Sequence, residues 1–395
     1  MTKFKFKSIF KNNVRVIPKY SEVLLNNRLD KDFQTTILPF NIIQTIYLNF
    51  RYIIRDYFIT NNTPSVNCVM VSVAISIWVA VLCLYLTELK SDDSWQKISA
   101  TFVMATDFII FNIGYISNTV VKIRKSQHSV VLILKIQKAY NLYKNERYKA
   151  VAVLNWLIIM SSVIWFSFEF IYWHLLERAV SYIYIILDIL LPILEIDVLY
   201  AICLMKLMRI NMQNWARQMK IYSLNFEGMD LRTRSTGMMN LLVIYKDLMK
   251  AYKLYQETLQ TMVTLFNNST IFTSVVCSKA HKVILSLILL QNYFLAMVTL
   301  IFTVRTCKYF IYITLLAYEI YVCDRWALLI LYQNIIKICF TDERRVCKNI
   351  RRLYRTQFTK MSICGVYTLD AELPLKLLAL IATYTVVLLQ AALVN

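Results

Sequence analysis

The segment AELPLKLLALIATYTVVLLQAALV covers residues 371–394, close to the end of the chain. Asp370, just before it, can cap a helix N-terminus, and Pro374 would lie in the first turn, where its missing N–H is tolerated. At 1.5 Å per residue, a helix of these roughly 24 residues would be about 36 Å long. Because that length crosses about 30 Å of hydrocarbon, the segment predicts a membrane-spanning helix.

The composition of the whole chain favours membrane insertion. Hydrophobic residues make up 58% of the 395 residues and charged residues 17%, against about 45–50% and about 25% in soluble domains. The chain has only 4 Gly and 5 Pro, which favours long uninterrupted helices over the turn-rich hairpins of a β-barrel. We therefore expect an all-α integral membrane protein.

Further apolar segments upstream are long enough to cross a bilayer. They are residues 68–89, 99–121, 151–173, 181–207, 258–281 and 296–322. The helical pattern of the fourth segment continues to about residue 218. Residues 283–294 are also apolar and either extend the fifth span or form an outer re-entrant segment. Hydropathy therefore leaves the count at seven or eight, and we expect seven transmembrane helices.

The segment Ile37–Phe58 is aromatic and apolar, but Arg51, Arg55 and Asp56 interrupt it. We interpret it as an amphipathic helix on the cytoplasmic membrane surface, with a true span as the alternative. The basic start of the chain has no apolar core and no small-residue cleavage site. We therefore expect no signal peptide, and the first span would direct insertion.

Basic residues gather in every second loop, after the second, fourth and sixth spans, whereas the gaps after the first and third spans are short and nearly neutral. The positive-inside rule then places the N-terminus in the cytoplasm and, after seven spans, the C-terminus outside the cell. This pattern also explains the net charge of +20, so no nucleic-acid partner is expected. It excludes a G-protein-coupled receptor, whose N-terminus is extracellular.

Other function classes lack their sequence signatures. The 3 His residues are far apart and without metal-ligand spacing. No Gly-rich phosphate loop or catalytic constellation is evident, so we expect no enzyme activity, no metal and no cofactor. The 9 Cys lie in spans or basic loops, which argues against a disulfide framework. No internal repeat supports a transporter built from inverted repeats.

The C-terminal stretch Thr383-Tyr384-Thr-Val-Val-Leu-Leu-Gln390 resembles the insect gustatory receptor family. Members of that family carry Thr-Tyr, five mostly apolar residues, Gln and Phe near the C-terminus. Here Ala391 stands in place of the Phe. The basic run over residues 344–355 and the sequence Leu-Pro-Phe-Asn at residues 38–41 also resemble lepidopteran members.

The resemblance implies a tastant-gated, non-selective cation channel, with bitter or plant secondary compounds as ligands, in the plasma membrane of a gustatory neuron dendrite. It implies the insect chemoreceptor fold and a homo- or heterotetramer with other gustatory receptors. Residues 1–67 would be a cytoplasmic N-terminal segment, and residues 68–337 would hold spans one to six, the ligand pocket and cytoplasmic helix extensions. Residues 338–366 would be a cytoplasmic anchor, and residues 367–395 the pore-lining seventh helix.

Two alternatives to this function stay open, and the basic run of the anchor segment also has two interpretations. An odorant-receptor-type subunit of the same superfamily would need a co-receptor to give current. A secondary transporter would give saturable flux without channel-like conductance. The basic run over residues 344–355 either faces lipid as positive-inside charge or forms an intersubunit anchor. Membrane lipids, permeant cations and a small-molecule tastant would be the partners.

The seventh helix carries the predicted pore. Positions 383, 387 and 390 fall on one helical stripe, and the predicted pore and gate residues are Thr383, Tyr384, Val387, Leu388, Gln390 and Ala391. Four Gln390 amides could hydrate a cation path while an apolar ring closes it by dewetting. Alternatively, Gln390 caps the helix or binds a neighbouring helix. Because Ala391 is small, the constriction would move to Leu388 or Val387, or the channel would leak more.

Acidic residues inside spans are costly and therefore indicate function. The predicted ligand-pocket residues are Trp165, Glu169, Tyr172, Tyr184 and Asp188, and Glu195 shares the helix face of the last two. Aromatic walls with few polar groups suit an alkaloid or glycoside, and a carboxylate suits a cationic alkaloid. Alternatively, the aromatics form an interfacial belt and the acids make structural hydrogen bonds. Structural or inner-facing roles are expected for Asp107, Asp197 and Glu319.

Overall fold

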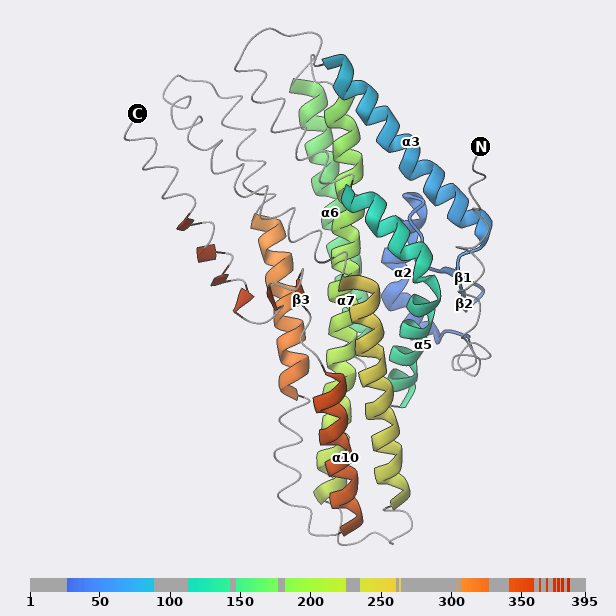
Figure 1. The fold of residues 1–395 in the computed structure, drawn as a ribbon, viewed down its shortest axis with the longest axis vertical. Coiled ribbons are helices and arrows are strands. Elements are labelled where there is room, and N and C mark those ends of the chain that lie inside the picture. Colours follow the sequence, from blue (N-terminus) through green and yellow to red (C-terminus); the bar gives the residue numbers. More distant parts are fainter. Residues whose placement is uncertain are drawn as a thin grey trace, which may run out of the picture.

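A computed structural model of the protein describes most of the chain between residues 27 and 383. The described residues are 27–88, 113–142, 147–176, 182–224, 235–260, 263, 304, 307–326, 341–358, 362–363, 367–368, 372–373, 375–376, 378–379 and 382–383. Within them the protein is mostly helical, which confirms the all-α class. Long helices run side by side along the longest axis (Figure 1).

The N-terminal part combines helices with one small hairpin. Its elements are α2 (Lys31–Ile46), β1 (Ile53–Arg55), β2 (Phe58–Thr60), α3 (Pro64–Glu88), a helix over residues 113–124 and α5 (Ser126–Leu142). The C-terminal part is formed by α6 (Arg147–Leu176), α7 (Tyr182–Leu224), helices over residues 235–260 and 307–326, α10 (Thr341–Gln357), β3 (Ser362–Ile363) and β4 (Tyr367–Thr368).

Helices occur where the first, third, fourth and sixth spans are expected, as α3, α6, α7 and residues 307–326. The fourth continues to Leu224, a little beyond the expected end at about residue 218. Residues 258–281 and 371–394 lie largely outside the described residues, although described positions between 373 and 383 are helical.

The expected helix over Ile37–Phe58 is wrong in its bounds. Helix α2 ends at Ile46, and strands β1 and β2 follow as an antiparallel hairpin. Asp56 and Tyr57 form its two-residue loop with φ of 47° and 69°, and two successive positive φ values match the right-handed twist of paired strands. The helix packs against α6 and α7. Its place at a membrane surface stays a prediction.

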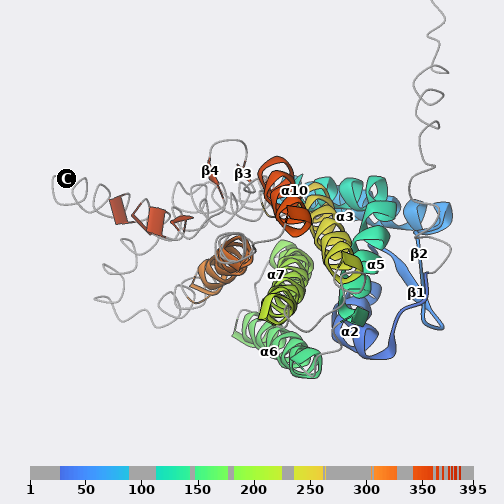
Figure 2. The ribbon, with the colours of Figure 1, turned by 90° about the horizontal axis from the view of Figure 1, so that it is seen from below.

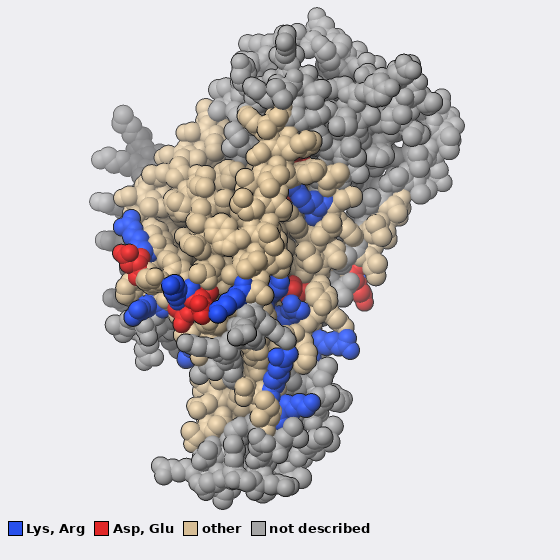
Figure 3. All heavy atoms as spheres, turned by 180° about the vertical axis from the view of Figure 1, so that it is seen from behind, with Lys and Arg blue, Asp and Glu red and all other residues tan. Residues whose placement is uncertain are grey.

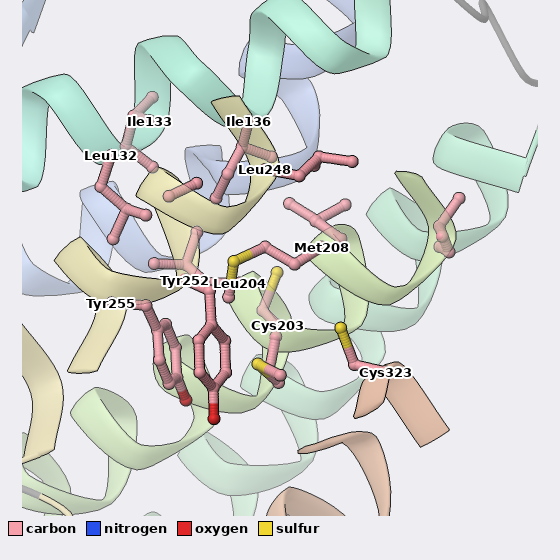
Figure 4. Close-up of a cluster of buried hydrophobic side chains, with 14 of the residues drawn as sticks. Leu132, Ile133, Ile136, Cys203, Leu204, Met208, Leu248, Tyr252, Tyr255 and Cys323 are labelled. Atoms are coloured by element: carbon pink, nitrogen blue, oxygen red, sulfur yellow. The ribbon is translucent and has the colours of Figure 1, made fainter. Parts of the chain in front are cut away.

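Helix α7 lies at the centre of the described bundle. Figure 2 shows it between α6 and the helix of residues 235–260. Figure 4 shows why this region holds together, because apolar side chains of α5, α7 and residues 235–260 interdigitate around Leu204 and Met208. Trp215 is fully buried and its Nε1 donates to the Leu241 carbonyl over 2.9 Å. Such a buried indole needs this bond to offset its desolvation.

Helix α10 is attached to the bundle by stacked rings. The Phe358 ring lies 4.4 Å from that of Tyr252 at an interplanar angle of 11°, and 5.3 Å from that of Tyr354. The Tyr354 hydroxyl also donates to Asp324 in the helix of residues 307–326. On α10 itself, Ile350 is buried while Arg351 and other basic residues are exposed. The C-terminal part is thereby connected to two helices of the bundle.

Helix α6 has the properties of a membrane span. Among the described helices, it alone is long and apolar enough to cross a bilayer, over Tyr148–Ile171, and only 28% of its apolar window is buried. The apolar part of α3, Pro64–Val79, is shorter. Figure 3 shows a broad face almost free of charged side chains, above a band in which acidic and basic residues gather. The seven-span topology therefore stays a prediction.

Candidate functional site

An ammonium and a carboxylate meet between α7 and the helix of residues 307–326. The Nζ atom of Lys308 lies 2.9 Å from Oε2 of Glu195. The carboxylate side chain has no solvent exposure, whereas the lysine side chain is 18% exposed. A buried carboxylate requires such a partner, because the loss of hydration would otherwise cost several kcal/mol. We name this pair and its surroundings the Lys308 cage.

Aromatic rings surround the same ammonium. Lys308 Nζ lies 4.6 Å from the ring centroid of Phe166, 5.7 Å from that of Trp165 and 5.9 Å from that of Tyr309. An ammonium within about 6 Å of a ring centroid is attracted by the negative face of the ring. Successive positions on α6 and on the helix of residues 307–326 therefore supply three aromatic contacts to one charge.

The carboxylate of the cage is held in place from its other side. The Tyr312 hydroxyl donates to Oε1 of Glu195 over 2.8 Å, so both carboxylate oxygens have partners. Glu169 is fully buried on α6, one turn beyond Trp165. The indole Nε1 of Trp165 is buried and has no acceptor among the described residues. The arrangement can recognise a cation and offers one further hydrogen-bond donor.

The structure describes the side chains of only some of the predicted ligand-pocket residues. Trp165 lies in the Lys308 cage and Glu169 is buried on the same helix. Tyr172 belongs to α6 and both Tyr184 and Asp188 to α7, but their side chains lie outside the described residues. Their role in a ligand pocket stays a prediction.

Sequence reasoning missed the central residue of the cage. Lys308 lies inside the sixth apolar segment, and neither it nor Phe166, Tyr309 or Tyr312 is among the predicted site residues. A usable signal was present, since a lysine inside one span predicts an acidic partner inside another. Glu195 was the candidate on a neighbouring span, yet the pairing depends on helix register, which hydropathy does not determine.

Of the predicted pore and gate residues, the structure describes only Thr383. It is helical and exposed, and its Oγ1 donates to the Ala379 carbonyl over 2.8 Å. The others, Tyr384, Val387, Leu388, Gln390 and Ala391, lie outside the described residues. The pore assignment therefore stays a prediction.

A second buried ionic cluster surrounds Asp197 of α7. Its carboxylate lies 2.6 Å from Nζ of Lys122 and 3.3 Å from Nη2 of Arg51, and all three side chains are at most 1% exposed. Amide side chains of three further residues donate to the same carboxylate: Gln44, Asn49 and Asn118. These contacts give the buried carboxylate several partners, and a structural role for Asp197 stays a prediction.

The Asp197 cluster joins parts of the chain that are far apart in sequence. Arg51 comes from the loop after α2, and its guanidinium also lies 5.4 Å from the ring centroid of Tyr200. Its backbone carbonyl accepts a hydrogen bond from Ser126 at the start of α5. Glu319 also has a partner on another helix, since Nε of Arg209 in α7 lies 2.6 Å from its Oε2. We interpret these contacts as supports of the bundle.

The geometry defines a mostly helical protein in which the Lys308 ammonium, the Glu195 carboxylate and aromatic rings meet between helices. Comparison with models of known protein families and with curated proteins finds no match to this chain.

Proposed function

We propose that the protein is a chemosensory receptor of the insect gustatory type, a tastant-gated and non-selective cation channel. The Thr383-Tyr384…Gln390 stretch and the alternating loop charge support this proposal from the sequence. The structural observation that carries it is the Lys308 cage, in which an ammonium lies beside a buried carboxylate and against an aromatic ring between apolar helices. Bitter or plant secondary compounds are the proposed ligands.

The exposed face of α6 supports membrane insertion. Leu157 and Ile164 are 62% and 64% exposed, and other large apolar residues of α6 are exposed as well. Water-soluble proteins rarely expose contiguous apolar patches of this kind, and a soluble core helix would be mostly buried. In a bilayer, lipid chains would cover this apolar face of α6, so no protein partner would be needed.

We further propose seven spans, a cytoplasmic N-terminus, an extracellular C-terminus and a tetramer in which four seventh helices line the pore. Helix α7 continues to Leu224, beyond the expected end of its span at Leu207. This continuation supports the cytoplasmic helix extensions proposed within residues 68–337. The stacked contact of Phe358 with Tyr252 supports an ordered anchor in residues 338–366.

Electrical recording tests the channel. The chain is expressed alone in cells without G-protein signalling, and surface delivery is followed with a tag at Asn395 that is labelled without permeabilisation. We expect inward current on application of a tastant panel, with altered ion selectivity in Gln390→Ala. Surface-delivered protein without current from any tastant would contradict the proposal, and unchanged gating and selectivity in Gln390→Ala would contradict the pore assignment.

A secondary transporter is the second candidate, because a buried Glu195–Lys308 pair also suits ion-coupled transport. Saturable uptake without channel-like conductance would favour it. An odorant-type subunit would instead give current only when a co-receptor is expressed with it. The same cell line distinguishes all three outcomes.

A further inference from the structure

We propose that the Lys308 ammonium is a built-in occupant of an organic-cation site, and that tertiary or quaternary ammonium ligands bind by displacing it. The inference rests on the proposed function for its physiological ligand, a tastant, but the recognition itself needs only the cage. Lys308, Phe166 and Tyr309 are not among the site residues that the sequence predicts.

The two partners in the cage differ in how easily they can leave it. Glu195 has no solvent exposure and its second oxygen accepts the Tyr312 hydroxyl bond, whereas Lys308 is 18% exposed. The lysine ammonium is carried by a flexible four-carbon stem, which allows it to swing toward water or headgroups. When the ammonium leaves, the carboxylate and the rings of Trp165 and Phe166 stay on α6 and α7.

The chemistry of the cage favours a particular class of cation. A lysine ammonium is compact and strongly hydrated, so placing it among three rings carries a large desolvation cost. An alkylated ammonium is more weakly hydrated and still attracted by the ring faces, which is why aromatic cages recognise quaternary ammonium groups. The Trp165 Nε1–H, without an acceptor among the described residues, suits a ligand with an ether, ester or hydroxyl oxygen.

Displacement has a structural consequence. The Lys308–Glu195 and Tyr312–Glu195 contacts join α7 to the helix of residues 307–326. The same helix carries Asp324, which accepts the hydrogen bond from Tyr354 of α10. A ligand that replaces Lys308 removes one of these two links and thereby weakens the attachment of the helix that leads toward the anchor. The ligand and the tethered lysine therefore compete for one carboxylate.

Lysine labelling of the wild-type full chain in lipid nanodiscs tests the displacement. Reductive methylation is followed at each lysine by mass spectrometry, with the exposed Lys149 of α6 as the control. We expect Lys308 to react at least about tenfold more slowly than Lys149, because its ammonium is buried and lies in an ion pair with Glu195. Tetramethylammonium, which has no reactive N–H, should accelerate labelling at Lys308 alone, whereas tert-butanol, its neutral isostere, should not.

A set of variants provides the second measurement. Lys308→Ala leaves the cage empty, and Lys308→Met fills it with an uncharged side chain of similar length. We expect n-propylammonium to raise the melting temperature of Lys308→Ala, but not of Lys308→Met or of Lys308→Ala combined with Glu195→Gln. 1-Propanol should have no such effect on Lys308→Ala.

Three results would each overturn the inference. The first is equal labelling of Lys308 and Lys149, and the second is labelling of Lys308 that tetramethylammonium does not change. The third is equal stabilisation of Lys308→Ala by the amine and the alcohol. If Lys308→Ala fails to fold, the labelling of the wild-type protein decides alone. Displacement of Lys308 without current in any cell line would support the cation site and contradict the channel. Current from neutral tastants, without displacement of Lys308 by tetramethylammonium, would support the channel and contradict the cation site.

Discussion

The Nζ atom of Lys122 lies 2.6 Å from Oδ2 of Asp197, and neither side chain is exposed. Arg51 adds a second buried cation to the same carboxylate at 3.3 Å. One carboxylate therefore contacts two basic residues from different parts of the chain, and its single negative charge is shared between them. This arrangement explains why basic residues that interrupt apolar sequence can be part of the core.

Asp197→Asn should strongly destabilise the protein, because it leaves the charges of Arg51 and Lys122 buried without compensation. We expect a loss of about 3–5 kcal/mol, the usual cost of breaking a buried ion pair. Thermal unfolding in detergent, followed by intrinsic fluorescence, measures it. Combining Asp197→Asn with Lys122→Met should recover part of the loss, and a double variant no better than the single one would contradict this account.

Two lysines on α5 should differ in their effect, although both lie 2.8 Å from the carboxylate of Asp247. The Lys135 side chain is 9% exposed and that of Lys138 is 61% exposed. Lys138→Met should change stability by at most about 1 kcal/mol, as is usual for surface pairs. Lys135→Met should cost more stability, because the largely buried carboxylate of Asp247 would then keep only the exposed Lys138 as its ionic partner. Equal losses in the same unfolding assay would refute this ranking.

The ion pairs of Asp247 with Lys135 and Lys138 predict a dependence of stability on pH. Burial alone would raise the pKa of Asp247, but hydrogen bonds and charge from Lys135 and Lys138 hold it below its ordinary value of 3.8. Because the folded-state pKa is lower than the unfolded one, the stabilisation is complete above the ordinary value and is lost as the pH falls through and below it. The stability difference between the wild-type protein and Asp247→Asn should therefore stay constant from about pH 7 to about pH 5.5 and shrink below about pH 4. A difference that grows on acidification would contradict the assigned partners.

Leu157→Lys tests whether the exposed face of α6 contacts lipid. A lysine near the middle of a span costs about 2.5–3.5 kcal/mol in membrane insertion, whereas on a water-exposed helix face it is close to neutral. We expect a marked loss of inserted protein in a glycosylation-based insertion assay, with Leu157→Ala as the matched control. Equal insertion of the two variants would argue against a membrane span at α6.

Phe358→Ala should release α10 from the bundle, because its ring stacks on Tyr252 and Tyr354. Since Phe358 is half-buried, we expect a loss of roughly 1–3 kcal/mol, below the value for a fully buried phenylalanine. Hydrogen exchange should become faster at amides of α10 and stay unchanged at those of α2. Unchanged exchange in α10 would show that other contacts hold it.

Long apolar helices were predictable because their signal is local. Length and hydropathy place α3, α6 and α7 close to their observed positions, and the continuation of α7 follows from its helical pattern. The expected helix over Ile37–Phe58 was wrong because the same local signal, an aromatic and apolar run, does not reveal a tight turn. The chain turns into a hairpin at Asp56 and Tyr57, which both have positive φ values. A composition average does not resolve such a turn.

The sequence by itself determined the helical class, the apolar segments and the presence of costly charges within them, because these depend on residue type and spacing along one helix. Only the tertiary structure decided which charges meet. Gln44 and Asp197 are 153 positions apart, and Tyr312 and Glu195 are 117 apart. Such pairs depend on the rotation and register of helices against one another, which side-chain packing determines and hydropathy does not. For that reason the sequence could single out Trp165 on its helix, while the contact of Trp165 with Lys308 could be seen only in the folded chain.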